Sequence, residues 1–489
     1  MRVLFCFSVA EEFLAKVARD LQAADPNVEL SGLALSRYEY RNVLKSSARW
    51  KHVSVVSDAL REHTPAKADV RYLREIERKY GDPNLYMIAA GDWYVKDYRH
   101  EQMLRVLEGT FRHLEVLWER VKPDAIVAEG IDCVSSYALY TMAKHHGVPF
   151  LWPATRTPNR VAFVGNPEER WERMEEILES LQDSPLDPDR RAKAQSYVTA
   201  FKTEGHRPTY VQAIRMPSLG LHSLQLFLDT MRINRADSGS YHTIPMWKLP
   251  FRRLRRMARR AVADALFFDR PDPRDEFVLF GLHYQPEAST LVWAPYYVDQ
   301  ASLAERIAKS LPVGHWLYVK EHPFAVGRRP LSEYQRLRRI PQVKLIAPYV
   351  DSHTLIPKAA CVATITGTLG WEAMLYERPV VTFGRGFCRT SGLLHLVHEI
   401  EELPALLREA IYSWRPDREQ LLKVVTAAME GSHVGDIGYR DGVAQARSDP
   451  NALLVAQALS KELKIHLGRQ TPRYRAGPEV GEDAATITK

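Results

Sequence analysis

Residues 317–384 contain three short motifs: LYVKEHP at 317–323, TITGTLGWEA at 364–373 and PVVTFG at 379–384. In each motif a polar turn accompanies a short apolar run rich in β-branched residues. Such runs are typical of buried parallel strands. The carboxyl ends of parallel strands share one edge of a sheet, and ligands bind beyond that edge in open α/β folds. The stretch therefore predicts a parallel sheet with a nucleotide site at its strand ends.

The same alternation of short strands and amphipathic helices occurs in both halves of the chain. Strands are expected at 3–7 and 125–128, with a helix at 135–146, and a second series opens with a strand at 277–280. We predict an α/β protein of two Rossmann-like domains facing a cleft, with the last helix crossing back to the first domain. The predicted ranges are 1–165 for the N-terminal, acceptor-side α/β domain, 166–275 for a helical insertion or linker, 276–467 for the C-terminal nucleotide-binding α/β domain and 468–489 for a disordered tail.

The composition excludes several classes of protein. The 489 residues are 45% hydrophobic and 26% charged, as in a soluble globular protein, and contain no apolar run long enough to span a membrane. The N-terminal apolar run is too short for a secretory signal, so we expect a cytoplasmic protein. The four cysteines show no CxxC or Cys/His spacing, which disfavours disulfides and zinc. An Asp-x-Asp pair occurs only at 187–189, outside any strand pattern, so no metal or other cofactor is expected.

Six arginines concentrate the net charge of +7 in one segment, Arg252–Arg260. Apolar residues recur between them at helical spacing, which predicts a basic amphipathic helix. Such a helix favours an anionic membrane surface. It is also compatible with a surface helix that packs on the body through its apolar face. No nucleic-acid-binding motif accompanies the arginines, so nucleic acid is not an expected partner.

The strand-end motifs supply groups suited to a phosphate. Pro323 turns the chain after its strand and presents His322, whose imidazole can donate to a phosphate oxygen, and Lys320 adds positive charge nearby. In the turn Thr366-Gly367-Thr368, the glycine lets the backbone approach a ligand, and the start of the next helix suits an anion. Glu372 would accept from ribose hydroxyls or cap its own helix. The Gly-Lys-Ser/Thr ending of a Walker loop is absent, which disfavours ATP hydrolysis.

A polar loop after the first strand of the second domain, at 281–290, is expected to face the same edge. It contributes Gln285, Glu287 and Ser289 as candidate ligand-binding residues, although a plain surface turn would have a similar composition.

With these motifs in place, residues 277–384 resemble the capsule polysaccharide biosynthesis family, two-domain GT-B-like sugar transferases that include capsule Kdo transferases. The resemblance rests on Tyr284–Thr290, Ile307–Pro312, Val319–Pro323, Asp351-Ser352, Thr364–Thr368 with Glu372-Ala373, and Pro379-Val380 with Phe383-Gly384. The His-Pro and Thr-Gly-Thr elements also resemble those of bacterial sialyltransferases. By this similarity His322 and Thr366 to Thr368 would contact the donor phosphate, and Glu372 its ribose.

The resemblance implies a glycosyltransferase that moves a sugar, such as Kdo, from a nucleotide donor, with a CMP-sugar favoured, onto a bacterial surface polysaccharide or its lipid-linked primer. The catalytic carboxylate is expected in the first domain, at Glu129 or Asp132, with Glu11 and Glu12 as alternatives. Arg156 and Arg160 are candidates for an acceptor phosphate or a donor carboxylate. The arginine helix would hold the enzyme at the inner face of the cytoplasmic membrane.

Two other functions fit the same pattern. One is a UDP-sugar transferase or a sugar 2-epimerase on the same two-domain frame. The other is a polysaccharide-binding or export partner that keeps the fold without catalysis.

Overall fold

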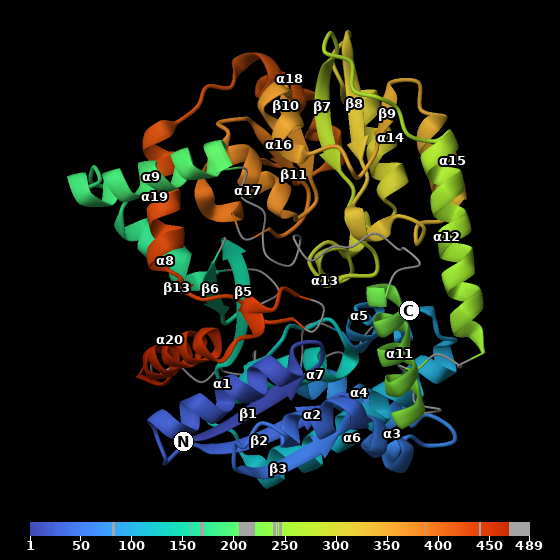
Figure 1. Cartoon of the computed structure of the whole chain (residues 1–489), viewed down its shortest axis with the longest axis vertical. Helices are drawn as coiled ribbons and strands as arrows, with labels where there is room; N and C mark the ends of the chain where they lie inside the picture. Colours follow the sequence, from blue (N-terminus) through green and yellow to red (C-terminus); the bar gives the residue numbers. More distant parts are fainter. Residues whose placement is uncertain are drawn as a thin grey trace, which may run out of the picture.

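The computed structural model describes residues 1–80, 84–157, 159–166, 171–204, 221–237, 241, 243, 247–386, 388–439 and 442–468. Its strands form two sheets, one in each half of the molecule (Figure 1). The first sheet has the order β13-β6-β5-β4-β1-β2-β3, and the second has the order β12-β11-β10-β7-β8-β9.

The bounds of the strands follow. The first sheet consists of β1 (Arg2–Phe7), β2 (Glu29–Ala34), β3 (Trp50–Val55), β4 (Ala125–Ala128), β5 (Phe150–Thr157), β6 (Arg160–Val164) and β13 (His433–Val434). The second consists of β7 (Glu276–Gly281), β8 (His315–Lys320), β9 (Val343–Ile346), β10 (Cys361–Thr364), β11 (Val380–Thr382) and β12 (Leu394–Leu396).

Both sheets have a Rossmann-like strand order. Within each domain, the first six strands lie in the order 3-2-1-4-5-6. Strands 2 and 3 are added on one side of the first strand, and strands 4 to 6 are added on its other side. The second sheet is parallel throughout, whereas in the first sheet β6 pairs antiparallel with β5 and with β13. The predicted α/β fold of two Rossmann-like domains is therefore confirmed.

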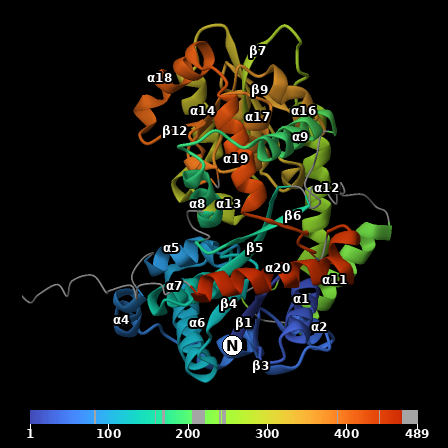
Figure 2. The ribbon, with the colours of Figure 1, turned by 90° about the vertical axis from the view of Figure 1, so that its left-hand side faces the viewer.

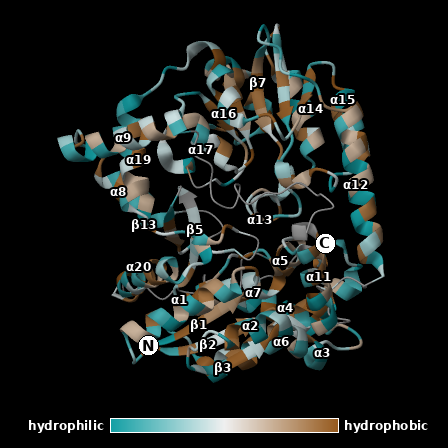
Figure 3. Cartoon of the chain, in the orientation of Figure 1, coloured by the Kyte–Doolittle hydropathy of each residue, from teal (hydrophilic) through white to brown (hydrophobic). Residues whose placement is uncertain are grey.

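The first sheet is covered on both faces because alternate residues of a strand point to opposite sides. Val3, Phe5 and Phe7 pack against α1 and α20, while Leu4 and Cys6 face the core formed with α6 and α7. Figure 3 shows the hydrophobic character of β1 that results. The helices of this layer are α1 (Glu11–Ala24), α2 (Arg37–Leu44), α3 (Val56–His63), α4 (Val70–Tyr80), α5 (Leu85–Ala90), α6 (His100–Val121) and α7 (Val134–His146).

The second sheet repeats this arrangement. Phe277 and Leu279 pack with α17 and α19, and Val278 and Phe280 face the core formed with α14, α15 and α18. The helices of this domain are α13 (Ala288–Leu291), α14 (Gln300–Ser310), α15 (Leu331–Arg338), α16 (Ser352–Leu355), α17 (Thr368–Leu375), α18 (Leu403–Arg408) and α19 (Arg418–Glu430).

The described helices that come between the two domains in the sequence pack on different helices of both domains. α8 (Glu172–Ser180) and α9 (Pro188–Glu204) pack on α19, α11 (Leu221–Ala236) lies beside α2, and α12 (Lys248–Leu266) lies along α15. The last helix, α20 (Asp449–Gly468), packs on α1, as Figure 2 also shows. The chain thus crosses back to the first domain, so the range 276–467 spans parts of both domains. The predicted tail beyond 468 lies outside the described residues.

Candidate donor-binding site

Three polar loops meet at one edge of the second sheet. β7 lies between β10 and β8, and all three run parallel, so the loops that follow them leave the sheet side by side. His283, after β7, links two of these loops: its Nε2 accepts a hydrogen bond from the Thr366 N–H at 3.3 Å. Gln300 holds the His283 backbone, donating to its carbonyl at 3.1 Å and accepting from its N–H at 2.7 Å. The convergence predicted for these loops is therefore present.

His322, at the end of β8, presents a hydrogen-bond donor. The Phe324 N–H donates to its Nδ1 at 3.2 Å, so in the neutral ring the proton resides on Nε2. Burial lowers the pKa of His322 to about 4, which keeps the ring neutral at physiological pH. Among the described residues, no hydrogen-bond partner occupies Nε2, so this N–H can donate to a ligand.

A buried ion pair supports the loop that carries His322. Arg329 Nε donates to the Glu321 carboxylate at 2.7 Å, with both side chains almost fully buried. Tyr334 donates to the same carboxylate at 2.5 Å, and the Arg329 guanidinium also donates to the His283 carbonyl at 3.1 Å. Glu321 in the quoted motif is thus a structural residue, and its partners Arg329 and Tyr334 could not be recognised from the motif alone.

The start of α17 is open to an anion. Gly367 is the N-cap, and no side chain caps the helix; the Gly370 N–H donates to the Gly367 carbonyl at 3.2 Å, but the N–H groups of Thr368 and Leu369 have no intrahelical acceptor. These groups and the helix dipole favour a negative charge. A Cβ at Gly367 would lie 3.0 Å from His283 Nε2, which explains the glycine at this position.

Other predicted residues lie at the same edge but have internal partners. Gln285 Nε2 donates to the Val298 carbonyl at 2.9 Å, and the Ser289 hydroxyl donates to Glu287 at 2.8 Å. The Thr366 hydroxyl donates to the Ser289 carbonyl at 2.9 Å. The remaining predicted residues are Lys320, which is buried, and Thr368 and Glu372, which are half-buried in the first turns of α17.

Glu129 lies at the end of β4 and holds the β1–α1 turn. Its carboxylate accepts hydrogen bonds from the backbone N–H groups of Ser8, Val9 and Ala10, at 2.9, 2.5 and 2.8 Å. Burial raises the pKa of Glu129 to about 8, although these N–H groups oppose the increase and Glu11 adds to it. Both carboxylate oxygens are engaged, so Glu129 is better suited to holding the turn than to proton transfer.

Asp132, the other predicted carboxylate, follows Glu129 in the loop after β4. It lines one small cavity together with Glu129, Cys133 and Ser136. Burial raises the pKa of Asp132 to about 6, with a smaller contribution from Asp92. No other side chain of the described residues hydrogen-bonds to it. A carboxylate with this pKa can accept a proton near neutral pH.

Aromatic contacts connect the two sets of residues. The Trp93 ring of the first domain lies 6.4 Å from that of Tyr284, which is 6.1 Å from the His322 ring. Trp152, next to Gly130, lies 5.5 Å from Trp293 in the loop after β7. The loop after β7 therefore contacts the strand-end region of the first domain.

Of the two predicted arginines, Arg160 has a structural role. It donates to the carbonyls of Met429 and Ser432 at 2.5 and 2.7 Å, which holds the end of α19 against β6. The side chain of Arg156 lies outside the described part of the structure.

Large apolar side chains at the start of α12 are exposed instead of packed on the body. Trp247, directly before the helix, and Phe251 and Leu254 within it are 66%, 68% and 67% exposed. The arginines on the opposite side contact the body: Arg259 donates to the Arg328 carbonyl at 3.3 Å, and a Cβ at Gly327 would lie 2.3 Å from the Arg256 carbonyl oxygen. Leu249 and Ala263 of the same helix are buried, so α12 packs on the body through part of its apolar residues, whereas the predicted packing of Phe251 and Leu254 on the body is wrong.

The described residues contain neither a membrane-spanning helix nor a metal-binding cluster. No described helix is both long and apolar enough to cross a bilayer. No group of three or more His, Cys, Asp or Glu side chains in the described ranges is arranged to hold a metal ion.

Comparison with known proteins links one part of the chain to a family. Residues 251–402 match the family model described as capsule polysaccharide biosynthesis protein. No curated protein sequence matches the chain.

Solved structures with a similar arrangement include two from Thermosulfurimonas dismutans. The KpsC β-Kdo 2,7 transferase is 13% identical, with a TM-score of 0.39, over 72% of this chain and 89% of that one. The KpsC β-Kdo 2,4 transferase is 17% identical, with a TM-score of 0.36, over 65% and 85%. The UDP-GlcNAc 2-epimerase from Neisseria meningitidis is 15% identical, with a TM-score of 0.26, over 94% and 100%.

The matched residues 251–402 contain all three loops of the candidate site and the motifs in which the resemblance was recognised. Residues 251–402 are therefore similar to the capsule polysaccharide biosynthesis family, in agreement with the resemblance found in the sequence.

Proposed function

We propose that the protein is a glycosyltransferase whose second domain binds a nucleotide-sugar donor. The observation that carries the proposal is a pair of unoccupied donor sets at one sheet edge: the Nε2–H of His322, and the N–H groups of Thr368 and Leu369 at the start of α17. Both are neutral donors in a rigid frame, and fixed donors stabilise negative charge that develops on a leaving phosphate. The family match over residues 251–402 supports a role in capsule polysaccharide biosynthesis.

The donor favoured by this proposal is a CMP-sugar, such as CMP-Kdo, and the acceptor is a surface polysaccharide or its lipid-linked primer. During transfer the bond between the anomeric carbon and the phosphate oxygen breaks, and the electron pair stays on the phosphate. His322 and the α17 N–H groups would stabilise that charge. Lys320, Thr366, Gly367, Thr368 and Glu372 complete the proposed donor site, with Gln285, Glu287 and Ser289 shaping its neighbouring loop.

Asp132 is the preferred catalytic carboxylate. As a base it would take the proton of the acceptor hydroxyl as its oxygen bonds to the anomeric carbon; as a nucleophile it would bond to that carbon first. Glu129 remains in the proposal as the residue that holds the turn beside it. The Asp132→Asn substitution should abolish CMP release from CMP-Kdo while preserving CMP binding. Full activity of this variant would remove Asp132 from the mechanism.

Donor binding can be tested with a thermal-shift panel of CMP, UDP, GDP and ADP. A nucleotide at about 100 times its Kd should stabilise the fold by roughly 2.7 kcal/mol. We expect stabilisation by CMP that is lost in His322→Ala and retained in His100→Ala, which removes an exposed histidine at the start of α6. Equal stabilisation of His322→Ala would contradict the site. A response to UDP alone would favour a UDP-sugar enzyme, and none would favour a binding or export partner.

We also propose that α12 holds the protein at the anionic inner face of the cytoplasmic membrane. Trp247, Phe251 and Leu254 form an exposed stripe, and the exposed Arg252 and Arg255 flank it. Large apolar side chains with basic neighbours suit the boundary between lipid headgroups and acyl chains. Leaving such a stripe in water forfeits about 1.5–3 kcal/mol of burial per side chain, which favours a covering surface.

Vesicle co-sedimentation tests this placement. Wild-type protein should bind vesicles of phosphatidylcholine with phosphatidylglycerol and bind pure phosphatidylcholine less. The pair Phe251→Ser and Leu254→Ser should abolish binding. The pair Leu453→Ser and Leu454→Ser, which removes two exposed leucines from α20, should not. Equal loss in both double variants would reject α12 as the attachment site.

A further inference from the structure

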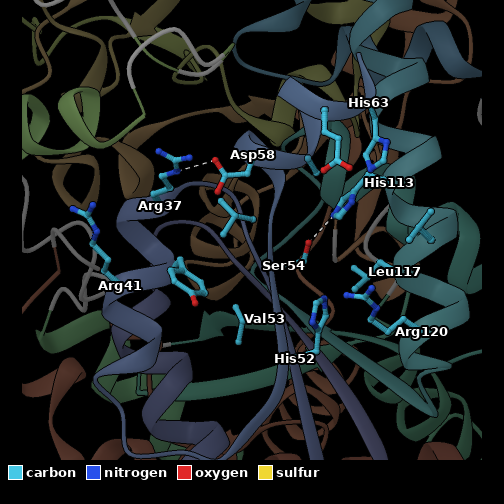
Figure 4. A pocket seen from close by; sticks show the side chains of 15 residues that line it. Arg37, Arg41, His52, Val53, Ser54, Asp58, His63, His113, Leu117 and Arg120 are labelled. Carbon is cyan, nitrogen blue, oxygen red and sulfur yellow. Dashed lines mark hydrogen bonds and ion pairs between the residues drawn. The ribbon is translucent and has the colours of Figure 1, made fainter. Parts of the chain in front are cut away.

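A cavity of about 690 Å³ lies along β3, at the edge of the first sheet (Figure 4). α2 forms one wall, and α3 and α6 form the other. Figures 1 and 2 both place β3 at the end of the molecule that is remote from the second domain. The candidate donor site does not include any residue of this cavity.

The floor of the cavity is an unpaired strand edge. β3 pairs in parallel with β2 and has no other strand neighbour in the described part of the sheet. Every second backbone N–H and C=O of β3 therefore points away from β2. His52 to Val55 line the cavity, so these polar groups face it. They can exchange hydrogen bonds with a ligand rich in hydroxyl groups.

Both walls of the cavity carry arginines. On α2, Arg37 forms an ion pair with Asp58 at 2.8 Å, and Arg41 lies beside Arg37. On the opposite wall Arg120 of α6 lies near His52, as Figure 4 shows. Neither Arg41 nor Arg120 has a carboxylate partner among the described residues. Each wall therefore offers one cation to an acidic ligand.

Histidines supply neutral hydrogen-bonding groups between the charges. Burial and the nearby Arg120 lower the pKa of His52. His113 Nε2 lies 2.8 Å from the Ser54 hydroxyl, and burial lowers the pKa of His113 to about 4. Uncharged imidazoles at these positions can donate to or accept from hydroxyl groups.

We propose that this cavity binds an acidic segment of the glycan acceptor, at a distance from its reacting end. The inference rests on the proposed transferase function. Carboxylates of the segment would pair with Arg41 on one wall and with Arg120 on the other, since a planar guanidinium matches the two oxygens of a carboxylate, and the hydroxyls would bond to the β3 edge and His52. Binding here would hold the acceptor chain on the first domain while its end reaches the donor.

The test uses oligogalacturonate hexamer as the acidic probe and its fully methyl-esterified form as the neutral probe. Affinity is measured by isothermal titration at about 50 mM salt, where exposed charges are incompletely screened. Wild-type protein should bind the acid and not the ester. The pair Arg41→Ala and Arg120→Ala should weaken binding about tenfold. Both arginines are exposed, so the variant should fold normally.

The pair Arg74→Ala and Arg78→Ala serves as the matched control, since it removes two exposed arginines from α4. Equal weakening in this control would overturn the proposal, because a general charge effect would then explain the result. Failure of wild-type protein to bind the acid, or equal binding of the ester, would overturn it too.

Three further outcomes count against a glycan. Inorganic phosphate that displaces the hexamer at equal concentration would indicate a site for a free anion. A poly-glutamate peptide that binds more tightly than the hexamer would indicate an acidic protein segment. A dimer that dissociates in the double arginine variant would indicate pairing of β3 with a second copy. Nucleotide binding is measured separately through His322→Ala, so failure of the donor proposal is distinguishable from failure here.

Discussion

The two sheets share a strand order, but the polar groups at their carboxyl edges are used differently. At the first sheet, Glu129 receives three backbone N–H groups and fixes the turn before α1. At the second sheet, hydrogen bonds among Glu321, Arg329 and Tyr334 fix the turn after β8. His322 in the same turn therefore keeps its Nε2–H available.

The difference suggests how a sheet edge whose polar groups can bind a ligand is distinguished from one whose polar groups only hold the neighbouring turns. A polar group that already completes its hydrogen bonds inside the protein has little to offer a ligand. A binding edge needs a second layer of residues that takes over the support. The second sheet has such a layer, and in the first sheet Asp132, beside the fully engaged Glu129, has no side-chain hydrogen-bond partner in the described structure.

The largest expected effect comes from removing this supporting layer. Arg329→Ala leaves the Glu321 carboxylate buried without its charged partner, which should lower the free energy of unfolding by about 3–5 kcal/mol. Urea denaturation at neutral pH measures it. Replacing both residues together, with Glu321→Leu and Arg329→Met, should recover much of the loss. A loss below about 1 kcal/mol in Arg329→Ala would show that the ion pair does not support this edge.

The two histidines at the carboxyl edge of the second sheet should make the free energy of unfolding depend on pH, with an effect of intermediate size. Burial lowers the pKa of His283 to about 3 and that of His322 to about 4. Between pH 4 and 6.5 the unfolded chain therefore holds more protons than the folded one, and the free energy of unfolding rises with pH. At pH 5 each of the two rings should lower the free energy of unfolding by about 2 kcal/mol relative to its value at neutral pH.

The measurement is urea denaturation of wild-type protein and His322→Gln between pH 5 and 7. The variant should lose about half of the pH dependence that the two rings cause. An unchanged slope would mean that His322 is solvated like an ordinary surface histidine, and that the second edge is less rigid than the comparison requires.

Much of the fold was predictable because buried parallel strands have a strong local signature. The run at 125–128 is a strand with the predicted bounds. β2 and β3 were not predicted. β2 contains Ser31 and Gly32, which weaken the apolar run, and β3 alternates polar and apolar residues because it lies at an edge. Edge strands are only partly buried, so their sequences carry less of the signal.

The candidate site was predictable only in outline. Strand ends and turn residues located the loops correctly, since a parallel sheet brings its carboxyl ends together. The sequence could not indicate which groups are already occupied. The bonds from Thr366 to Ser289 and from Arg329 to Glu321 depend on contacts between separate segments. For the same reason it could not show that Phe251 and Leu254 of α12 point outward.

A smaller loss of stability is expected from a substitution at the carboxyl edge of the first sheet. Glu129→Gln replaces one accepting oxygen with an NH₂ group that faces a backbone N–H, so the free energy of unfolding should fall by about 1–3 kcal/mol. Thermal or urea denaturation measures the change, with Glu12→Gln, an exposed residue at the start of α1, as the control. A variant that keeps its stability and loses all turnover would make Glu129 catalytic and would break the comparison.

The smallest effect concerns Gln285, which was predicted to bind the donor but donates to the Val298 carbonyl. Gln285→Ala should lower the free energy of unfolding by about 0.5–1.5 kcal/mol, the net contribution of one hydrogen bond. If the bond only shapes the loop, the affinity for CMP should change by less than about threefold, or roughly 0.7 kcal/mol. Titration calorimetry on Gln285→Ala and His322→Ala compares the two directly. If both variants lose affinity equally, Gln285 contacts the donor, and an internally bonded side chain can exchange that bond for a ligand. The distinction between occupied and unoccupied groups would then no longer identify a binding edge, and the engaged oxygens of Glu129 would have to be reconsidered on the same terms.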